Sequence, residues 1–432
     1  MARALDVYLH VHLVGNLVQD NGGQMAFRYL ESWLDTPGAT PLSQSLPLRK
    51  ERFARKECRG FFAGILPEEG KREIIARNLG ISARNDYAML EQIGGECAGA
   101  VTFIPAGKTL PESNYSYRTL SSGELAAILK ELPKRPLLAG EEGIRLSLAG
   151  AQDKIAVRIE GGEISLPLGG APSTHILKPA VERFEGVVSN EALCMELAAS
   201  VGLPTAAVEK RVVEDMAYLL VERYDRVHRI GESGAPILER LHQEDFCQAQ
   251  GIVSEMKYQK EGGSSLKQCF ALLREVSSTP VIDLACLLDA VIYNYLVGNM
   301  DAHGKNFSLL YHGIGTDNLE ASLAPLYDIV STIYYPELSR TMAMKIGGEY
   351  ASEKVTSKNF ELLAEEAGLA KPMVKRRVPE LAETIIATLP KMEMADRFAE
   401  EVATLIRQRC ERAINGFRRQ GTSAQVLHPR PD

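Results

Sequence analysis

A long apolar segment that runs directly into a polar loop is the feature that most constrains this chain. Residues 282–297 (IDLACLLDAVIYNYLV) are apolar almost throughout, which predicts a buried helix within a larger helical domain. Residues 298–308 (GNMDAHGKNFS) then bring acidic, amide and basic groups together. Burying such groups without partners costs roughly 1–3 kcal/mol each. The loop that follows this helix therefore needs either polar partners or a function.

Three polar residues in and after this loop have a chemically specific spacing. Asp301 is followed five positions later by Asn306, and Asp328 comes after a predicted short strand over residues 307–311. This is the layout of a protein-kinase catalytic loop: the first Asp accepts the proton of the attacking hydroxyl, and the Asn and the second Asp bind Mg²⁺. The alternative is structural, with Asp301 as a helix cap and Asp328 as a surface turn residue. The full set at this spacing favours the catalytic interpretation.

A lysine earlier in the chain fits the same scheme. Residues 174–178 (THILK) predict a short strand that ends in Lys178, ahead of a helix over residues 189–201. In kinases, a lysine on a strand of the small lobe reaches the α- and β-phosphates and pairs with a carboxylate on the following helix. Glu191 and Glu196 are both candidates for that carboxylate, and the sequence does not separate them.

Two further segments are candidates for nucleotide contact. Residues 147–154 (SLAGAQDK) contain one glycine and match neither a Walker loop nor a GxGxxG pattern, so the pattern alone is weak. Backbone N–H groups of such small residues can still bind phosphate oxygens. Glu222 and Tyr224, at the end of a predicted strand, fit the adenine side of a site and a charged strand end equally well.

Five segments in one order resemble the HipA family of bacterial serine/threonine-kinase toxins. They are residues 147–154, 174–178, 221–226 (VERYDR), 243–248 (QEDFCQ) and 298–310. The resemblance covers nearly the whole chain and implies an α+β, protein-kinase-like fold with two lobes, a β-rich N-lobe and an all-α C-lobe. The chain departs from eukaryotic-type kinases because it has no HRD, no DFG and no regular activation segment ending in APE.

The resemblance and the strand and helix patterns together predict three segments. Residues 1–105 are expected to form the extra N-terminal subdomain of the family, where the antitoxin docks. Residues 106–228 are expected to form the kinase N-lobe, with the loop that covers the nucleotide. Residues 229–432 are expected to form the C-lobe, almost entirely helical outside the catalytic loop. Within the first segment, the alternation of Leu5 to Leu13 predicts one strand.

The resemblance also implies roles for individual residues. Asp301 is expected to be catalytic, Asn306 and Asp328 to bind the metal, and Ser147 to be an autophosphorylation site that ejects the nucleotide-covering loop. A phosphate there adds about −1.5 to −2 charges beside an anionic nucleotide, so such a switch is physically reasonable. The expected ATP contacts are Ala149, Gly150, Ala151, Gln152, Asp153, Lys154, Lys178, Glu222, Arg223, Tyr224, His303, Lys305, Asn306, Tyr327 and Asp328.

Charge limits the way in which the chain can meet DNA. The formal net charge of −7 argues against general nucleic-acid binding. A local basic cluster, made of Lys371, Lys375, Arg376 and Arg377, is a candidate for direct DNA contact or simply a solvated helix face. The resemblance implies a helix-turn-helix antitoxin dimer as partner, which would bridge the chain to operator DNA, and a protein substrate from the translation machinery, such as an aminoacyl-tRNA synthetase.

Composition predicts a cytoplasmic protein that does not enter a membrane. The longest apolar run stays short of the ~20 residues that a spanning helix needs, and the N-terminus has no signal-peptide cleavage pattern. Seven scattered cysteines without a CxxC pair favour reduced thiols and argue against a zinc site.

The leading functional hypothesis is an ATP- and Mg²⁺-dependent protein serine/threonine kinase that acts as the toxin of a toxin–antitoxin pair. One alternative keeps the phosphotransferase site and replaces the protein substrate with a small molecule. Another is a non-catalytic transcriptional corepressor built on a kinase fold. The retention of Asp301, Asn306, Asp328 and Lys178 argues against the corepressor.

Overall fold

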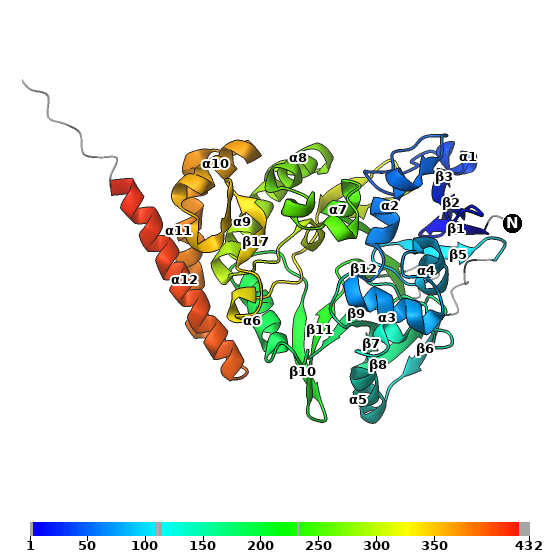
Figure 1. Ribbon diagram of the computed structural model, residues 1–432, viewed down its shortest axis with the longest axis horizontal. Coiled ribbons are helices and arrows are strands. Elements are labelled where there is room, and N and C mark those ends of the chain that lie inside the picture. The colour runs from blue at the N-terminus through cyan, green and yellow to red at the C-terminus, as the bar shows by residue number, and fades with distance from the viewer. Residues whose placement is uncertain (1–2, 109, 111–114, 231–233, 235, 423–432) are drawn as a thin grey trace, which may run out of the picture. The chain divides into compact units, whose positions relative to one another are not determined.

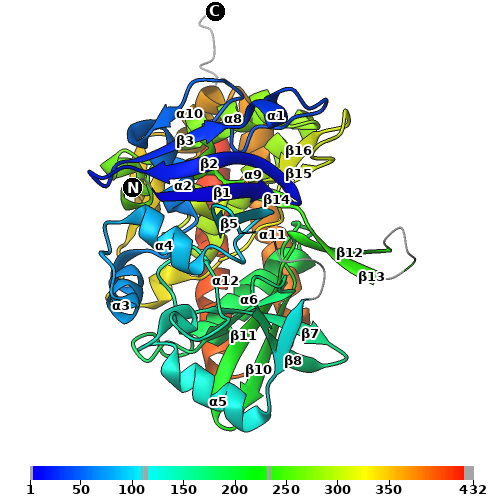
Figure 2. The same ribbon diagram turned by 90° about the vertical axis from the view of Figure 1, so that its right-hand side faces the viewer.

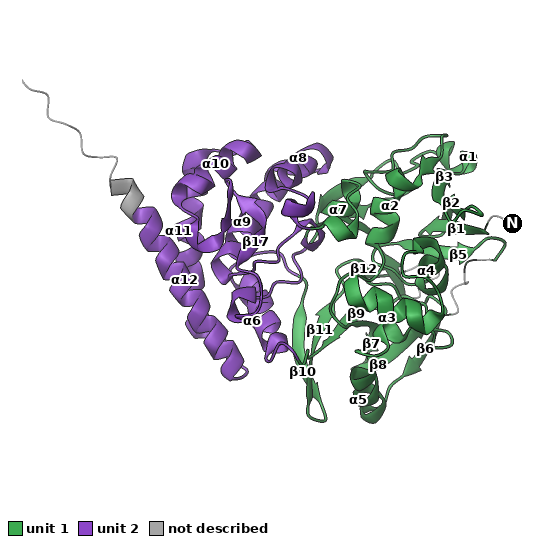
Figure 3. Cartoon of the chain, in the orientation of Figure 1, with its two compact units in different colours: residues 1–182, 206–257, 307–324 green, residues 183–205, 258–306, 325–432 purple. Residues whose placement is uncertain are grey.

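The computed structural model describes residues 3–108, 110, 115–230, 234 and 236–422. The chain divides into two compact units (Figure 3). Unit 1 comprises residues 1–182, 206–257 and 307–324, and unit 2 comprises residues 183–205, 258–306 and 325–432. The polypeptide therefore passes between the units several times.

Unit 1 begins with a five-stranded antiparallel sheet in the order β4-β3-β2-β1-β5 (Figure 2). Its strands are β1 (Arg3–Leu9), β2 (His12–Gln19), β3 (Met25–Tyr29), β4 (Phe53–Ala54) and β5 (Val101–Pro105), and its helices are α1 (Glu31–Leu34), α2 (Arg55–Gly64), α3 (Glu69–Leu79) and α4 (Asp86–Ile93). Leu5, Val7 and Leu9 alternate into the core, where they are fully buried.

The single strand expected from Leu5 to Leu13 is wrong. The chain turns at His10, which has a φ of 55°, and β1 then pairs with β2 so that Leu9 faces His12. Val11, at the turn, is 73% exposed. Alternation continues through this tight turn, so the pattern of apolar residues alone does not reveal it.

A second sheet in unit 1 has six strands in the order β10-β11-β9-β7-β8-β6. They are β6 (Ser116–Thr119), β7 (Ile155–Glu160), β8 (Glu163–Leu168), β9 (His175–Pro179), β10 (Val208–Val213) and β11 (Met216–Glu222), with helix α5 (Ser122–Glu131) between β6 and β7 in sequence. Gly161 and Gly162, both with positive φ, form the expected hairpin turn. Ser121 and Glu124 form a capping box at the start of α5.

Unit 1 also holds a hairpin and a three-stranded sheet. The hairpin pairs β12 (Arg226–Ile230) with β13 (Pro236–Arg240), and the sheet pairs β14 (His242–Asp245), β15 (Ser308–His312) and β16 (Glu320–Leu323), with helix α7 (Phe246–Ala249) after β14. The expectation of an almost wholly helical chain beyond residue 228 is therefore too simple. Short strands that pair with distant segments leave little periodic signal in the sequence.

Unit 2 is mainly helical and is built around one apolar helix. Its helices are α6 (Val187–Ser200), α8 (Leu266–Val276), α9 (Pro280–Val297), α10 (Ser357–Ala367), α11 (Lys371–Thr388) and α12 (Arg397–Thr422), and its hairpin pairs β17 (Thr341–Ile346) with β18 (Glu349–Ala351). Helices α8, α11 and α12 pack against α9 (Figure 1). Proline at the first turn of α9 and left-handed Gly298 at its end fix its limits.

Helix α9 is the predicted buried helix, and it forms the core of unit 2. Among the described residues it alone has the length and hydropathy of a membrane span, but 61% of that stretch is buried inside the protein. The α+β class is confirmed. The compact units do not follow the expected boundaries at 105 and 228, because α6 belongs to unit 2 and β14–β16 belong to unit 1.

Candidate functional site

The loop after α9 is fixed by its own polar side chains. The Asn299 amide donates to the Asn294 side chain at 2.8 Å and accepts the backbone N–H of Asp301 at 3.1 Å. The N–H of Met300 donates to the Thr332 hydroxyl at 2.8 Å. These bonds supply the partners that the buried polar groups of the loop require.

Asp301, the expected catalytic residue, presents an exposed carboxylate. One of its oxygens accepts a hydrogen bond from the Tyr258 hydroxyl at 2.9 Å. The Tyr258 ring also meets the His303 ring edge-on, with the centroids 5.7 Å apart. A carboxylate that is held by a neighbour and open to solvent can receive a substrate hydroxyl and its proton.

The structure brings the two expected metal ligands together. The Asn306 amide donates to the Asp328 carboxylate at 3.0 Å, and its oxygen accepts the backbone N–H of His303 at 3.2 Å. Asp328 has a φ of 60°, in the left-handed region that Asp enters more readily than most residues other than glycine. Residues held in such sparsely populated backbone regions are enriched at functional sites.

These residues fit a magnesium ion. An amide oxygen and a carboxylate are hard donors, and Mg²⁺ in phosphoryl-transfer sites takes one or two carboxylates together with water and substrate phosphates. Within the described part of the chain, no three His, Cys, Asp or Glu side chains are grouped to hold a metal by themselves. A site that is completed by nucleotide phosphates agrees with both observations.

The remaining expected contacts in unit 2 lie close to these ligands. His303 and Lys305 are buried beside Asn306 in the same loop. The Tyr327 hydroxyl donates to the backbone oxygen of Lys305 at 2.7 Å, which ties the loop after α9 to the segment that carries Asp328.

Helix α6 is bonded to the segment after Asp328. The Asn190 amide donates to the backbone oxygen of Ser331 at 3.1 Å and accepts the Ser331 N–H at 2.8 Å. On the same helix Glu191 is buried, whereas Glu196 is exposed. Burial favours Glu191 as the partner of a lysine, because a buried carboxylate needs a cation. Its pairing with Lys178 remains a prediction.

The expected nucleotide-covering loop lies in unit 1 and is folded onto its surroundings. Ser147 is fully buried, and its hydroxyl donates to the backbone oxygen of Ile65 at 3.0 Å. The ammonium of Lys154 donates to the backbone oxygen of Ala149 at 2.8 Å and so closes the loop. Gly150 has a φ of 108°, a backbone conformation that is strained for residues other than glycine.

Two more expected contacts in this region, Asp153 and Lys178, are buried. Asp153 forms an ion pair with Lys71 at 2.6 Å. Lys178 is buried on β9, opposite Leu219 of β11. Ala151 and Gln152 lie at the turn before β7 and are half-buried.

The ATP contact expected of Arg223 is wrong for its side chain, which is bonded within unit 1. Its guanidinium bonds Asp225 at 3.0 and 2.8 Å, Glu96 at 3.0 Å, the Ser173 hydroxyl at 2.9 Å and the Cys97 backbone oxygen at 2.8 Å. These bonds use all five of its N–H donors, so the side chain is structural and has no donor left for a nucleotide; an ATP contact through the Arg223 backbone remains a prediction. Glu222 is exposed, and the Tyr224 hydroxyl donates to Gln243.

Arginines surround Glu96 in this buried network. Arg223 and Arg226 bond one Glu96 oxygen at 3.0 and 2.8 Å, and Arg240 lies 2.7 Å from the other. Burial raises the pKa of Glu96, but the arginines outweigh burial and bring that pKa down to about 2. The motif VERYDR thus contributes more to the structure of unit 1 than to a binding surface.

The basic cluster on α11 is paired with acidic residues. Lys371 pairs with Glu365, Lys375 with Glu361, Arg376 with Glu380 and Arg377 with Asp289, at distances of 2.6–3.1 Å. Such pairing cancels much of the local positive charge and favours a solvated helix face. Direct DNA contact by this cluster remains a prediction.

Sequence reasoning missed Tyr258, Asn299 and Asn190. Asn299 stands in the polar loop itself, so its proximity to Asp301 was a usable signal. Tyr258 lies 43 positions before Asp301, and Asn190 lies 141 positions before Ser331, so no local pattern links them.

Comparison with known proteins agrees with this geometry. Residues 5–104 match the family model described as HipA N-terminal domain, and residues 146–389 match the HipA-like C-terminal domain. Y4mE of Sinorhizobium fredii, named as a candidate kinase, is 46% identical over 388 residues, which span 88% of this chain and 90% of Y4mE. The serine/threonine-protein kinase toxin HipA of Shewanella oneidensis is 29% identical over 96% of this chain and 98% of its own length.

A solved structure extends the likeness to the fold. The Shewanella oneidensis HipA, solved in a complex with HipB and operator DNA, superposes with a TM-score of 0.82 at 26% identity and covers 98% of this chain and all of its own. With both family models matched in order and Y4mE 46% identical over most of the chain, the chain belongs to the HipA-like kinase family.

Proposed function

We propose that this chain is an ATP- and Mg²⁺-dependent protein serine/threonine kinase that acts as the toxin of a toxin–antitoxin pair. The observation that carries this proposal is the pairing of Asn306 with left-handed Asp328 near a carboxylate, Asp301, that is exposed and held in place. A scaffold without catalysis has no need to keep a left-handed acidic residue in this arrangement.

Each residue has a defined role in this proposal. Asp301 orients the substrate hydroxyl and takes its proton as the new bond from oxygen to phosphorus forms. Asn306 and Asp328 hold the metal. When bound, Mg²⁺-ATP supplies the transferable phosphoryl group, and ADP is the leaving group. Lys178 and the loop 149–154 are the proposed contacts to the phosphates, and Glu222 and Tyr224 are the proposed contacts on the adenine side.

The proposed partners follow from the relatives. A HipA from Shewanella oneidensis has been solved with HipB and operator DNA, which supports a helix-turn-helix antitoxin as the partner of this chain and its route to DNA. The acidic net charge and the neutralised cluster on α11 support DNA contact through that partner rather than through this chain alone. The proposed substrate is a protein of translation, such as an aminoacyl-tRNA synthetase.

Radiolabelled ATP tests the reaction and its acceptor. The purified chain is incubated with Mg²⁺, labelled ATP and a bacterial lysate, beside Asp301→Ala and, as a matched control, the exposed Asp317→Ala. We expect labelled protein from the wild type and Asp317→Ala, and at least a 100-fold slower reaction from Asp301→Ala, because a lost base typically costs about 10²–10⁴-fold.

Three results would contradict the proposal. An Asp301→Ala variant with near wild-type turnover would remove the assigned base. Label in small molecules instead of proteins would favour a small-molecule phosphotransferase. Failure of the folded wild type to bind Mg²⁺-ATP would favour a corepressor without catalysis.

A further inference from the structure

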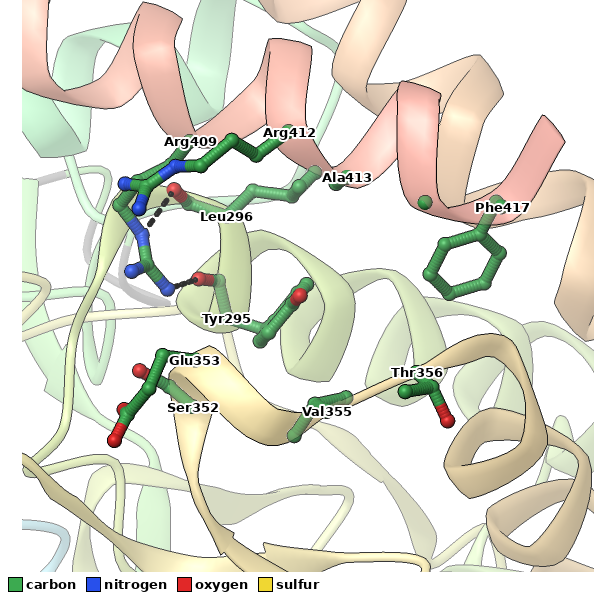
Figure 4. Close-up of a pocket in the computed structure, with 11 residues that line it drawn as sticks. Tyr295, Leu296, Ser352, Glu353, Val355, Thr356, Arg409, Arg412, Ala413 and Phe417 are labelled. Atoms are coloured by element: carbon green, nitrogen blue, oxygen red, sulfur yellow. Dashed lines mark hydrogen bonds between the residues drawn. The ribbon is translucent and has the colours of Figure 1, made fainter. Parts of the chain in front are cut away.

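Arg409 of α12 donates hydrogen bonds to the C-terminal turn of α9. Arg409 donates from Nε to the backbone oxygen of Leu296 at 3.2 Å and from a terminal nitrogen to that of Tyr295 at 2.6 Å (Figure 4). Its guanidinium also lies 5.6 Å from the centre of the Tyr295 ring. The last carbonyls of a helix have no partner within the helix, and a cation there also complements the helix dipole.

This turn is the one from which the catalytic loop starts. Helix α9 ends at Gly298, three residues before Asp301. A Cβ on Gly298 would lie 2.4 Å from the side chain of Ile333 and 3.3 Å from Nε of Arg409. Arg409 therefore packs against both the last turn of the helix and the first residue of the loop.

A chain of hydrogen bonds leads from this turn to Asp301. The backbone oxygen of Asn294, one residue before Tyr295, accepts the N–H groups of Gly298 and Asn299 at 3.1 and 2.9 Å. The Asn294 side chain then receives the Asn299 amide, which in turn accepts the N–H of Asp301. A shift of the last turn of α9 would thus move the proposed base.

Beside Arg409 lies a cavity of about 220 Å³. Its lining includes Tyr295, Val355 and Phe417, together with Arg412, which lies about one helical turn beyond Arg409. Arg412 is exposed, and its Nε donates to the backbone oxygen of Gln408 in its own helix at 3.4 Å. Two arginines thus border one cavity, and of these two Arg409 is bonded to α9.

We propose that Arg409 is a positioning residue for phosphoryl transfer, which fixes the last turn of α9 and through it the placement of Asp301. The proposal rests on the proposed kinase function. Arg409 touches neither nucleotide nor substrate in this role, so its loss should slow the chemical step and leave nucleotide affinity unchanged. Misplacing a catalytic group by about 1 Å can cost roughly 100-fold in rate.

The test compares Arg409→Ala, Arg409→Lys and, as matched control, Arg412→Ala. For Arg409→Ala we expect kcat to fall roughly 10- to 100-fold with KM for ATP unchanged, and the amides of Asp301 and His303 to exchange hydrogen faster. Arg409→Lys should recover part of the loss, since an ammonium can still donate to one carbonyl. Millimolar guanidinium should restore part of kcat in Arg409→Ala, because the removed side chain borders a cavity, and Arg412→Ala should match the wild type.

The outcomes separate this inference from the proposed function. Unchanged kcat and unchanged exchange at Asp301 in Arg409→Ala would overturn the positioning role, as would an equal loss of kcat in Arg412→Ala. Faster exchange spread over all of unit 2, without rescue by lysine or guanidinium, would make Arg409 merely structural. A wild type that transfers no phosphate would refute the kinase function, while the exchange comparison would still decide whether Arg409 holds the loop.

Discussion

At the scale of single residues, the candidate site depends on groups that hold a carboxylate rather than on the carboxylate alone. Asp301 is exposed, so solvent competes for it, and the Tyr258 hydroxyl and the Asn299 side chain fix its oxygen and its backbone. A catalytic group must be pre-positioned to contribute to rate, because productive geometry accounts for much of the barrier reduction in phosphoryl transfer. Tyr258 is therefore the residue whose loss should be most specific to the reaction.

Tyr258→Phe removes one hydroxyl and keeps the ring contact with His303. A hydrogen bond to a charged group contributes about 1.5–3 kcal/mol, and the exposure of this pair favours the lower limit. We expect kcat to fall about tenfold with little change in KM for ATP, since each 1.36 kcal/mol is about tenfold in rate. Steady-state kinetics measures this, with Tyr350→Phe as control because Tyr350 lies beneath Lys260 instead. An unchanged kcat would show that the hydrogen bond from Tyr258 to Asp301 does not contribute to the rate.

At the scale of elements, polar side chains join a helix or strand to a segment far away in sequence. Asn190 joins α6 to the segment after Asp328. Glu96, which precedes β5, pairs with Arg226 of β12 and Arg240 of β13. A buried polar group that loses one of its partners destabilises the fold, so these connections fix the relative placement of the elements that they join. Each can be broken by a single substitution.

Asn190→Ala should loosen the segment after Asp328. It leaves the N–H and C=O of Ser331 without their amide partner, at a cost of roughly 2–4 kcal/mol in unfolding free energy. We expect faster hydrogen exchange at Ser331 and weaker binding of Mg²⁺-ATP. Ser189→Ala is the matched control, because the neighbouring Ser189 hydroxyl bonds Asp396 instead. Equal effects of the two substitutions would mean that α6 is merely destabilised as a helix.

Glu96→Gln should destabilise unit 1 in a pH-dependent way. The substitution removes one of the two carboxylates that Arg223 and Arg226 share, while Asp225 remains, so we expect a loss below the ~3–5 kcal/mol of a fully broken buried pair. The folded pKa of Glu96, about 2, lies below its ordinary value of 4.5. The ionised carboxylate therefore stabilises the fold above about pH 4.5, and this contribution is lost as the pH falls toward 2.

Urea unfolding at a series of pH values measures this difference. Fluorescence of Trp33, the single tryptophan and a buried residue of unit 1, reports on the correct unit. We expect the gap between wild type and Glu96→Gln to narrow below pH 4.5, whereas Glu141→Gln, which breaks a more exposed pair with Arg118, should have little effect. A gap that stays constant down to pH 2 would contradict the assigned charge state.

At the scale of the whole molecule, sequence predicted compact motifs better than contacts between distant segments. The proximity of Asn306 and Asp328 was predictable because their spacing reflects one loop and one returning segment. Tyr258 and Arg409 were not, because their contacts join residues 43 and 113 positions apart or more. The nucleotide contact predicted for the Arg223 side chain was wrong for a related reason. A sequence pattern cannot show whether a charged side chain faces a ligand or a buried carboxylate.

The same limit applies to the strands. Apart from β15, which was predicted as a strand, the strands from β12 to β18 lie where a helical unit was expected, since strands of three to six residues carry too few periods to stand out. Helix α9, with eighteen residues of nearly continuous apolar sequence, was predictable to within two residues. Long elements and compact motifs are thus visible in sequence, and the contacts that assemble them are not.

Phosphorylation of Ser147 is the expected route by which the kinase would inactivate itself. Its hydroxyl is fully buried and bonded to Ile65, so it can receive a phosphate only when residues 147–154 leave their place in unit 1. A dianionic phosphate cannot return to that buried position without a cation, because its desolvation is too costly. Phosphorylation would therefore trap the loop outside and remove Lys154 and Gly150 from the proposed nucleotide site.

We expect Ser147→Ala to lose self-phosphorylation and to stay active toward other proteins for longer than the wild type. Mass spectrometry after incubation with Mg²⁺-ATP locates the phosphate, and limited proteolysis follows the loop, which should be cleaved faster in the phosphorylated wild type than in Ser147→Ala. Thr119→Ala, an exposed hydroxyl on β6, serves as control. Phosphate at another residue, or a loop equally resistant in both forms, would show that Ser147 does not control this loop. The buried position of Ser147 would then serve packing alone.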